Sequence, residues 1–320
     1  MMFRFAAIAA LVAALAAGGA IAASKLRLSI ATGGTGGVYY PYGGGLARVL
    51  SQKVPGFQVT AEVTGGSVDN IKLVGAGDAD IGLSTIDSAV DGLKGEGAYT
   101  DTGPQKIATI AVLYDSFVHI VARADAKIAK VADMKGKRVS VGSAGSSTEA
   151  IADRLLEAGG LKPMKDVTRE NLSVAESVGA LKDGKIHAMF WIGGLPTSAI
   201  TDLVTTSNVK VVFVPADDVL AKLNLKYPGL YRAFTLPKNV YSGVRADVPG
   251  VGVANIMFVN ADMPKPTVEK ILKGVFDNLP EVQKIHPEAK ALTLAGAAAK
   301  TAAPFHPAAT AFYKSRGVVK

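Results

Sequence analysis

The most constraining feature of the sequence is a strand–turn–helix unit that occurs twice. Residues 28–51 begin with a β-rich run, pass through the glycine-rich segment TGGTGG and continue with helical periodicity. Residues 139–158 follow the same plan, with the small residues GSAGSS at the turn. Each unit is followed by a second helix and strand, and the offset between the units is roughly 110 residues. The repeat predicts two similarly built lobes, each with one Gly/Ser-rich turn in an equivalent place.

Short β-rich runs alternate with helical periodicity along most of the chain, which predicts an α/β fold. We expect strands over residues 26–31, 57–63, 79–84, 107–113, 118–122, 138–141, 188–191, 210–214 and 252–259. We expect helices over residues 42–52, 67–76, 147–158, 175–183, 197–203 and 265–278, and a mostly helical segment over residues 280–317.

The repeat also predicts how the chain is divided. We assign lobe one to residues 24–114 plus 252–320, and lobe two to residues 115–251. The chain then crosses between the lobes twice, near residues 113–116 and 249–253. Two extended crossings form a hinge, and a hinge creates an interlobe cleft that can close on a ligand.

The N-terminus has the features of a secretory signal peptide. Arg4 supplies a positive charge, residues 5–17 form an uncharged apolar stretch, and Ala20 and Ala22 have the spacing that signal peptidase recognises. We therefore predict a signal peptide over residues 1–22 and export of the rest of the chain to the periplasm. The apolar run is shorter than the about 20 residues that cross a bilayer, so secretion is favoured over a membrane anchor.

Composition and charge narrow the classes of function. The sequence has no cysteine, which excludes thiol catalysis and metal sites built on cysteine. Its formal charge of +8 comes from basic residues scattered among acidic ones, without the basic stripe of a nucleic-acid-binding face. The excess charge indicates either a solvated basic surface or a field that attracts anions. The four histidines lack metal-ligand spacing, so we expect neither a metal nor a cofactor.

The first turn, residues 32–37, opens a helix directly after a strand. Its glycines let the backbone approach a ligand closely, and the free N–H groups at a helix start attract anions. The segment does not fit the dinucleotide pattern G-x-G-x-x-G, because the third glycine is missing and Glu62 lies too far along the chain. The alternative is a turn that only reverses the chain.

Two further turns offer hydroxyl and amide groups. Residues 62–70 again pass from strand to helix, and they provide Thr64, Ser67 and Asn70. Residues 142–148 do the equivalent in lobe two, and they provide Ser146, Ser147 and Thr148. Ser67 and Ser147 have a purely structural alternative as helix N-caps. Three strand–turn–helix segments from both lobes predict an anion-binding cleft.

Trp191 is the only tryptophan, and it is followed by Gly193 and Gly194 near the expected end of a strand. One interpretation is a residue of the hydrophobic core. The other is a wall of the ligand pocket, with Gly193 beside it.

Five motifs, in the order found along the chain, resemble the TAXI family of TRAP-transporter solute-binding subunits: TGGTGGVYYPYGGGLA, VTGGSVDN, SAGSSTEAIADRLLEAGGL, FWIGGLPTSAI and PFHPAATAFYKSRG. They cover nearly the whole chain after the predicted signal peptide. The resemblance implies a type II-like periplasmic binding protein with two α/β lobes. It also implies that the ligand, glutamate or a 2-oxoglutarate-like dicarboxylate, passes to TRAP membrane subunits driven by an ion gradient.

The resemblance implies ligand contacts from all three turns. They are Thr35, Gly36, Gly37 and Tyr39 in the first, Ser67 and Asn70 in the second, and Gly145, Ser146 and Thr148 in the third. We add Thr64, Thr85, Trp191 and Gly193 as candidates from the residue patterns and their positions. Thr85 and Ser147 depart from the family pattern, in which a glutamine and a glycine are expected, and both changes bear on which ligand fits.

The sequence thus favours a monomeric solute-binding protein without catalytic residues, whose partners are a small carboxylate and TRAP membrane subunits. The alternatives are a ligand-sensing subunit for a receptor kinase and an exported hydrolase, although the chain lacks a G-x-S-x-G elbow. An amine on the ligand would need an acidic partner, for which Glu62, Asp87 and Glu149 are candidates. If none of them points into the cleft, a dicarboxylate without an amine is favoured.

Overall fold

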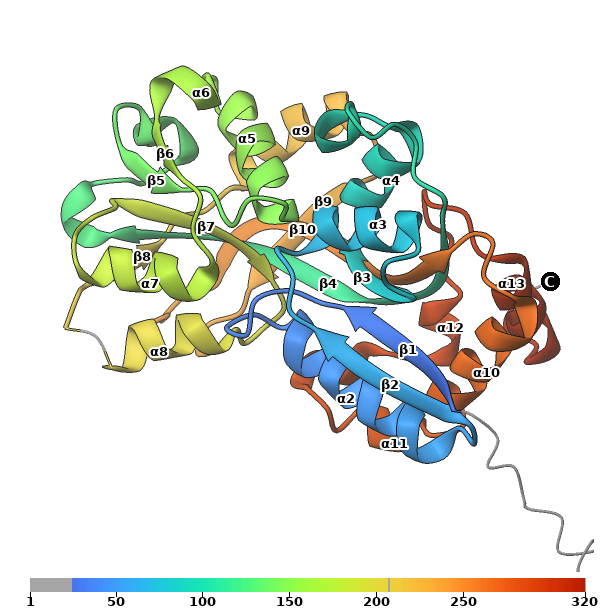
Figure 1. The fold of residues 1–320 in the computed structure, drawn as a ribbon. Helices are drawn as coiled ribbons and strands as arrows, with labels where there is room; N and C mark the ends of the chain where they lie inside the picture. Colours follow the sequence, from blue (N-terminus) through green and yellow to red (C-terminus); the bar gives the residue numbers. More distant parts are fainter. Residues whose placement is uncertain (1–24, 207, 320) are drawn as a thin grey trace, which may run out of the picture.

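The computed structural model describes residues 25–206 and 208–319, so the predicted signal peptide over residues 1–22 lies outside the described residues. Within the described part of the chain, ten strands form one sheet with the order β2-β1-β3-β10-β4-β7-β5-β6, where β8 pairs with β4 and β9 with β10. Helices cover this sheet, which confirms the predicted α/β class (Figure 1). No helix of the described ranges is long and apolar enough to cross a membrane.

The strands and helices of the first half follow the repeat. Its elements are β1 (Leu26–Ala31), α2 (Tyr39–Lys53), β2 (Phe57–Glu62), α3 (Ser67–Ala76), β3 (Ile81–Thr85), α4 (Ile86–Lys94) and the long strand β4 (Ile107–Arg123). The corresponding later elements are β5 (Arg138–Ser140), α5 (Ser147–Ala158), α6 (Pro163–Asp166), β6 (Thr168–Glu170), α7 (Val174–Lys182), β7 (Ala188–Gly193) and α8 (Ser198–Thr206).

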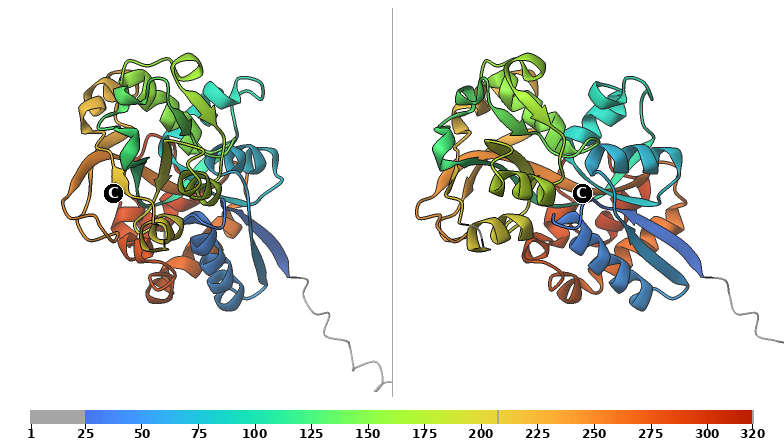
Figure 2. Two further views of the ribbon diagram at one scale, coloured as in Figure 1. Left: turned by 90° about the vertical axis from the view of Figure 1, so that its left-hand side faces the viewer. Right: turned by 60° about the vertical axis from the view of Figure 1, so that its left-hand side comes forward.

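The remaining elements complete both halves. They are β8 (Val211–Phe213), α9 (Leu220–Lys226), β9 (Tyr231–Leu236), β10 (Val248–Asn260), α10 (Lys265–Phe276), α11 (Leu279–Val282), α12 (Leu294–Ala297) and α13 (Pro307–Ser315). In Figure 1, β5 to β8 gather on the left with α5 to α8, and β1 to β3 gather on the right with α10 to α13. Figure 2 shows the same two groups from two other directions.

The strand order makes the internal repeat visible. Strands β2, β1 and β3 are parallel, and β10 runs antiparallel beside β3. Strands β6, β5 and β7 are likewise parallel, and β4 runs antiparallel beside β7. Each half of the sheet therefore has the same plan, and the two halves meet where β4 pairs with β10.

The two predicted crossings lie side by side in that central pair. Phe117 pairs with Gly252, and Ser116 with Val253, in antiparallel register. The register then shifts between Ala254 and Ile256. Such an irregularity locally weakens the ladder and bends the strand. The proposed hinge thus coincides with the one long strand pair that joins the two halves.

Several predicted elements need correction. Residues 107–113 and 118–122 form one continuous strand, β4, because the intervening polar Ser116 is buried and hydrogen-bonded to Asn255 at 2.9 Å instead of ending the strand. Strands β6 and β9 and helices α4, α6 and α9 were not predicted. The first of these, β6, has only three residues, and all of them are polar or charged. Residues 280–317 contain three short helices, one 3₁₀ helix and long connections, so they are less helical than expected.

Candidate functional site

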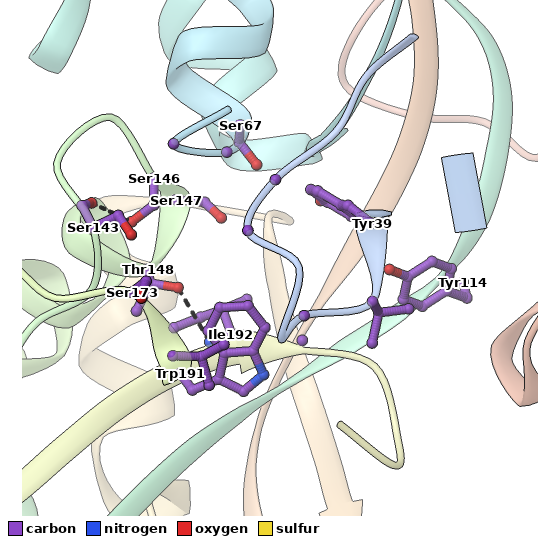
Figure 3. A pocket seen from close by; sticks show the side chains of 18 residues that line it. Tyr39, Ser67, Tyr114, Ser143, Ser146, Ser147, Thr148, Ser173, Trp191 and Ile192 are labelled. Carbon is purple, nitrogen blue, oxygen red and sulfur yellow. Dashed lines mark hydrogen bonds between the residues drawn. The ribbon is translucent and has the colours of Figure 1, made fainter. Parts of the chain in front are cut away.

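A narrow cavity of about 50 Å³ lies where the turns that follow β1, β2 and β5 meet the end of β7. Figure 3 shows Ser67 from α3 on one side, Tyr39 from α2 on another, Ser146 and Ser147 at the start of α5, and Trp191 from β7. The lining residues are Gly33, Gly34, Gly37, Val38, Tyr39, Gly65, Gly66, Ser67, Tyr114, Ser143, Ser146, Ser147, Thr148, Ser173, Val174, Trp191, Ile192 and Gly193.

Four helices begin at this cavity. Tyr39 is the first residue of α2, Ser67 of α3, Ser147 of α5 and Val174 of α7, and all four residues line the space. The first backbone N–H groups of a helix lack partners within the helix, and the helix dipole places partial positive charge there. The partial positive charge of four helix starts suits the cavity to an anion, although in α3 the N–H groups of Val68 and Asp69 already donate to the carbonyl of Gly145.

The described side chains that line the cavity are uncharged. Within the part of the chain that the structure describes, its lining contains glycines, hydroxyl groups, three aromatic residues and aliphatic residues, but no Asp, Glu, Lys, Arg or His. An anion in this space would be held by hydrogen-bond donors and helix dipoles. An ammonium group would find no carboxylate to balance its charge.

Two hydroxyl groups that line the cavity accept hydrogen bonds from the backbone. Ser67 Oγ accepts a hydrogen bond from the backbone N–H of Thr85 at 3.2 Å, and Thr148 Oγ1 accepts one from Ile192 at 3.3 Å. Each oxygen thus acts as an acceptor, and its own hydrogen can still be donated, in Ser67 either to the neighbouring Tyr39 hydroxyl or to a ligand. Ser146 differs, since its Oγ donates to the carbonyl of Ser143 at 2.6 Å and caps α5.

Trp191 forms a wall of the cavity. Its indole N–H donates to Thr197 Oγ1 at 2.9 Å, which fixes the ring. The ring lies so close to two glycines that a Cβ at Gly37 would stand 2.8 Å from it, and one at Gly193 would stand 2.4 Å from it. Glycine at both positions is therefore required for this placement of the ring, and Gly37 contacts it from the other half of the molecule.

Tyr39 ties the cavity to the strand crossing. Its hydroxyl donates to Asn255 Oδ1 at 2.5 Å, and Asn255 Nδ2 donates to the carbonyl of Tyr114 at 3.0 Å. Burial raises the pKa of the Tyr39 hydroxyl, so the group keeps its proton at neutral pH. The prediction missed Asn255, although a single Asn inside the apolar run GVGVANIMFV signals a buried polar role.

Six predicted residues do not line the cavity. In the first turn, Thr35 is exposed, and the carbonyl of Gly36 accepts a hydrogen bond from Ser198 Oγ at 3.0 Å. In the second turn, Thr64 Oγ1 donates to Asn70 Oδ1 at 2.6 Å. Asn70 is fully buried, and its Nδ2 donates at 2.7 Å to two strand-end carbonyls. These groups hold the turns in place, and direct ligand contact stays a prediction for them.

The remaining two predicted residues, Thr85 and Gly145, lie next to residues that line the cavity. Thr85 Oγ1 donates to Ser88 Oγ at 3.3 Å, and the Thr85 backbone supports Ser67. The carbonyl of Gly145 accepts the backbone N–H groups of Val68 and Asp69, both at 3.1 Å. A loop at the start of α5 therefore caps α3, which belongs to the other half of the molecule.

None of the three acidic candidates faces the cavity. Glu62 is exposed at the end of β2. Asp87 is fully buried and pairs with Arg154 at 3.1 Å. Glu149 pairs with Arg169 at 3.1 Å and is not among the lining residues. By contrast, Ser143, Ser147, Ser173 and Tyr114 do line it. Ser143, Ser173 and Tyr114 were not predicted, because their approach to the cavity depends on how distant segments pack together.

Comparison with known proteins places this geometry in context. The sequence matches the model of the NMT1-like family over residues 30–317. One similar structure, described as a periplasmic transporter, has a TM-score of 0.56 and 14% identity, covering 92% of this chain and 93% of the other. A protein from Bordetella bronchiseptica RB50 has a TM-score of 0.52 and 17% identity, with coverages of 92% and 90%.

A third structure is a binding protein component of an ABC phosphonate transporter from Pseudomonas aeruginosa. It has a TM-score of 0.51 and 13% identity, covering 83% of this chain and 79% of the other. At such identities the likeness concerns the fold alone. It agrees with the two-lobed, type II-like α/β architecture that the strand order displays.

Proposed function

The chain belongs to the NMT1-like family, and on that premise we propose that it is a solute-binding protein for a small carboxylate without an amine. The observation that carries the proposal is the cavity, in which four helix starts converge on a space with no charged side chain among its described lining residues. Hydrogen-bond donors and helix dipoles stabilise a carboxylate there. A 2-oxoglutarate-like dicarboxylate is therefore favoured over glutamate, because a desolvated ammonium group without a partner is costly.

Closure of two lobes would enclose the ligand. We propose lobe one as residues 24–114 plus 252–320 and lobe two as residues 115–251. The proposal is supported by the cavity itself, since Tyr39 and Ser67 come from the first of these ranges and Thr148 and Trp191 from the second. Motion about the β4–β10 pair would open and close this space.

The proposed setting is the periplasm, with delivery of the ligand to TRAP membrane subunits. The N-terminal sequence and the resemblance to the TAXI family support both points. One structural neighbour is named as part of an ABC transporter, so the membrane partner needs its own test. Adjacent genes for TRAP membrane subunits would support the proposal, whereas an adjacent transport ATPase or receptor kinase would contradict it.

A binding role also fits the cavity better than catalysis. The cavity serines have no histidine, lysine or carboxylate beside them in the described lining that would activate a hydroxyl as a nucleophile. We therefore propose that the protein is not an enzyme.

A thermal-shift screen tests the binding role. The panel contains 2-oxoglutarate, succinate, glutamate, aspartate, simple monocarboxylates and methylphosphonate. A ligand at about 100 times its dissociation constant adds roughly 2.7 kcal/mol to the free energy of unfolding, which raises the midpoint by a few degrees. We expect amine-free carboxylates to give the largest shifts.

The variant Ser67→Ala should reduce that shift, because it removes one hydroxyl donor from the cavity. Ser315→Ala is the matched control, since Ser315 lies in α13 and its hydroxyl donates only to the carbonyl of Phe312. A panel without any shift, or a shift that Ser67→Ala and Ser315→Ala reduce equally, would contradict the proposal.

A further inference from the structure

A charged cluster joins the two halves of the molecule outside the cavity. Arg154 in α5 lies between two carboxylates of α4: its Nη1 donates to Asp87 Oδ2 at 3.1 Å, and its Nη2 donates to Asp91 Oδ2. The side chain of Arg154 is 9% exposed and that of Asp87 is 0% exposed. An ion pair this well shielded from water depends on both partners.

Two tyrosines from the same proposed lobe as Arg154 contact its guanidinium group. The Tyr231 hydroxyl in β9 accepts a hydrogen bond from Arg154 Nη1 at 2.8 Å and donates one to Asp87 Oδ2 at 2.7 Å. The Tyr227 ring centroid lies 4.1 Å from the guanidinium carbon, which adds a cation–π contact. Both tyrosines belong to proposed lobe two, whereas both carboxylates belong to proposed lobe one. The guanidinium is thus fixed on one lobe and presented to the other.

The same helix connects this cluster to the cavity. Helix α5 begins with Ser147 and Thr148, which line the cavity, and it carries Arg154 further along. The loop before α5 places the carbonyl of Gly145 on the start of α3. A short helix moves as a rigid unit, so docking Arg154 against α4 also positions Thr148 at the cavity.

We propose that Arg154, Asp87, Asp91 and Tyr231 form an interlobe latch, in which Arg154 is a positioning residue that sets the balance between open and closed lobes. When the lobes are open, the charged groups are hydrated; when they are closed, the groups lose water and compensate one another. The latch thereby tunes affinity for every ligand by the same factor, because only the closed population binds tightly. This inference rests on the proposed closure of the two lobes.

Spin-label distances test the latch without any ligand. The sequence has no cysteine, so Gln52→Cys in α2 and Leu225→Cys in α9 introduce two unique labelling sites, both exposed. In the purified protein we expect a population at a short distance. Arg154→Met should move that population to longer distances, since it leaves two carboxylates buried without a compensating cation when the lobes are closed.

Affinity provides the second readout. With 2-oxoglutarate, succinate and glutamate as probes, Arg154→Met should weaken binding about tenfold or more, which is about 1.4 kcal/mol. The ratios between probes should stay within about twofold, because the latch does not touch them. Arg154→Lys should retain part of the effect. The triple variant Arg154→Met, Asp87→Asn, Asp91→Asn should recover closure, since no uncompensated charge remains.

Unchanged distances in Arg154→Met would overturn the latch, as would a change in the ratios between probes. If Arg154→Met does not fold by circular dichroism, Asp91→Asn and the triple variant decide the question by the same two readouts. If no probe binds the unmodified protein, the proposed function fails, while the distances still report on the latch.

Discussion

The cavity and the latch occupy the same interlobe region but use opposite chemistry. The described lining of the cavity has no charged side chain, and the hydroxyl oxygens of Ser67 and Thr148 accept hydrogen bonds from backbone N–H groups. The latch contains one guanidinium and two carboxylates, in which both Nη atoms of Arg154 and one oxygen of each carboxylate are hydrogen-bonded to protein groups. Both proposals involve residues of one helix, α5, but in separate parts of it. On these proposals, the first turn of α5 contacts the ligand, and a later turn sets how readily the lobes close.

A negative charge placed in the cavity should reduce affinity more than any other substitution considered for this site. In Ser147→Asp, a carboxylate would face a bound anion; at about 4 Å and an effective dielectric constant of about 20, the repulsion is about 4 kcal/mol. We expect loss of carboxylate binding by roughly a thousandfold in calorimetric titration. Helix α5 should stay intact, because an acidic residue at a helix start is favourable. Thr100→Asp, at an exposed position, is the control; equal losses in both variants would refute the role of the cavity.

A larger residue in place of Gly37, next to the Trp191 ring, should give the next largest loss of affinity. In Gly37→Ala, the new methyl group would stand 2.8 Å from the Trp191 ring, and overpacking of this kind costs about 1–3 kcal/mol. Affinity should therefore fall by about tenfold to a hundredfold. Gly44→Ala in α2 is the matched control, because a Cβ there meets nothing within 4 Å. That substitution should leave affinity unchanged and slightly raise the unfolding midpoint. Similar affinity losses in both variants would contradict the proposed wall.

Lowering the pH should have a smaller effect on the balance between open and closed lobes, and Asp91 of the latch contributes to it. Burial raises the pKa of Asp91 to about 6, against the lowering effect of Arg154 and with a further increase from Asp87. The hydrated group of the open form has a pKa of about 3.9. The closed form therefore binds more protons between about pH 4 and 6, so acidification from pH 7 to 5 favours closure by up to about tenfold.

The spin-label distances at pH 7 and pH 5 measure this effect. Asp91→Asn should abolish most of the change, because the titrating group is then absent. Glu288 also has a pKa raised by burial and contacts the backbone of Leu195 across the lobes, so the difference between the unmodified protein and Asp91→Asn is the quantity to compare. A pH response of equal size in Asp91→Asn would assign the effect to other groups.

Local patterns predicted the repeated elements well. The bounds of β1, α3 and α5 coincide with the predicted ranges, since strand periodicity and helix-start chemistry are properties of neighbouring residues. The turns that meet at the cavity were found for the same reason. The predictions that failed concern residues whose surroundings are formed by residues far away in the sequence. Asp87 and Asp91 in α4 look like a solvated helix face until Arg154, more than 60 residues later, covers them.

The same limit applies within the site. The sequence indicated that Ser67 and Asn70 share a turn. It did not indicate that Ser67 lines the cavity while the Asn70 amide donates to two strand-end carbonyls. Likewise, Ser173 and Tyr114 reach the cavity only because α7 and β4 are brought to it by the sheet order. Which member of a polar turn contacts a ligand is decided by tertiary packing.

The most direct test of the central claim is a fluorescence titration of Trp191, the only tryptophan and a wall of the cavity. The probes are two matched pairs that differ in the amine: 2-oxoglutarate with glutamate, and succinate with aspartate. The uncharged cavity predicts a saturable change in emission, with the amine-free member of a pair binding at least about tenfold more tightly, or about 1.4 kcal/mol. Equal or tighter binding of glutamate or aspartate would contradict the account, as would the absence of any saturable change with both pairs.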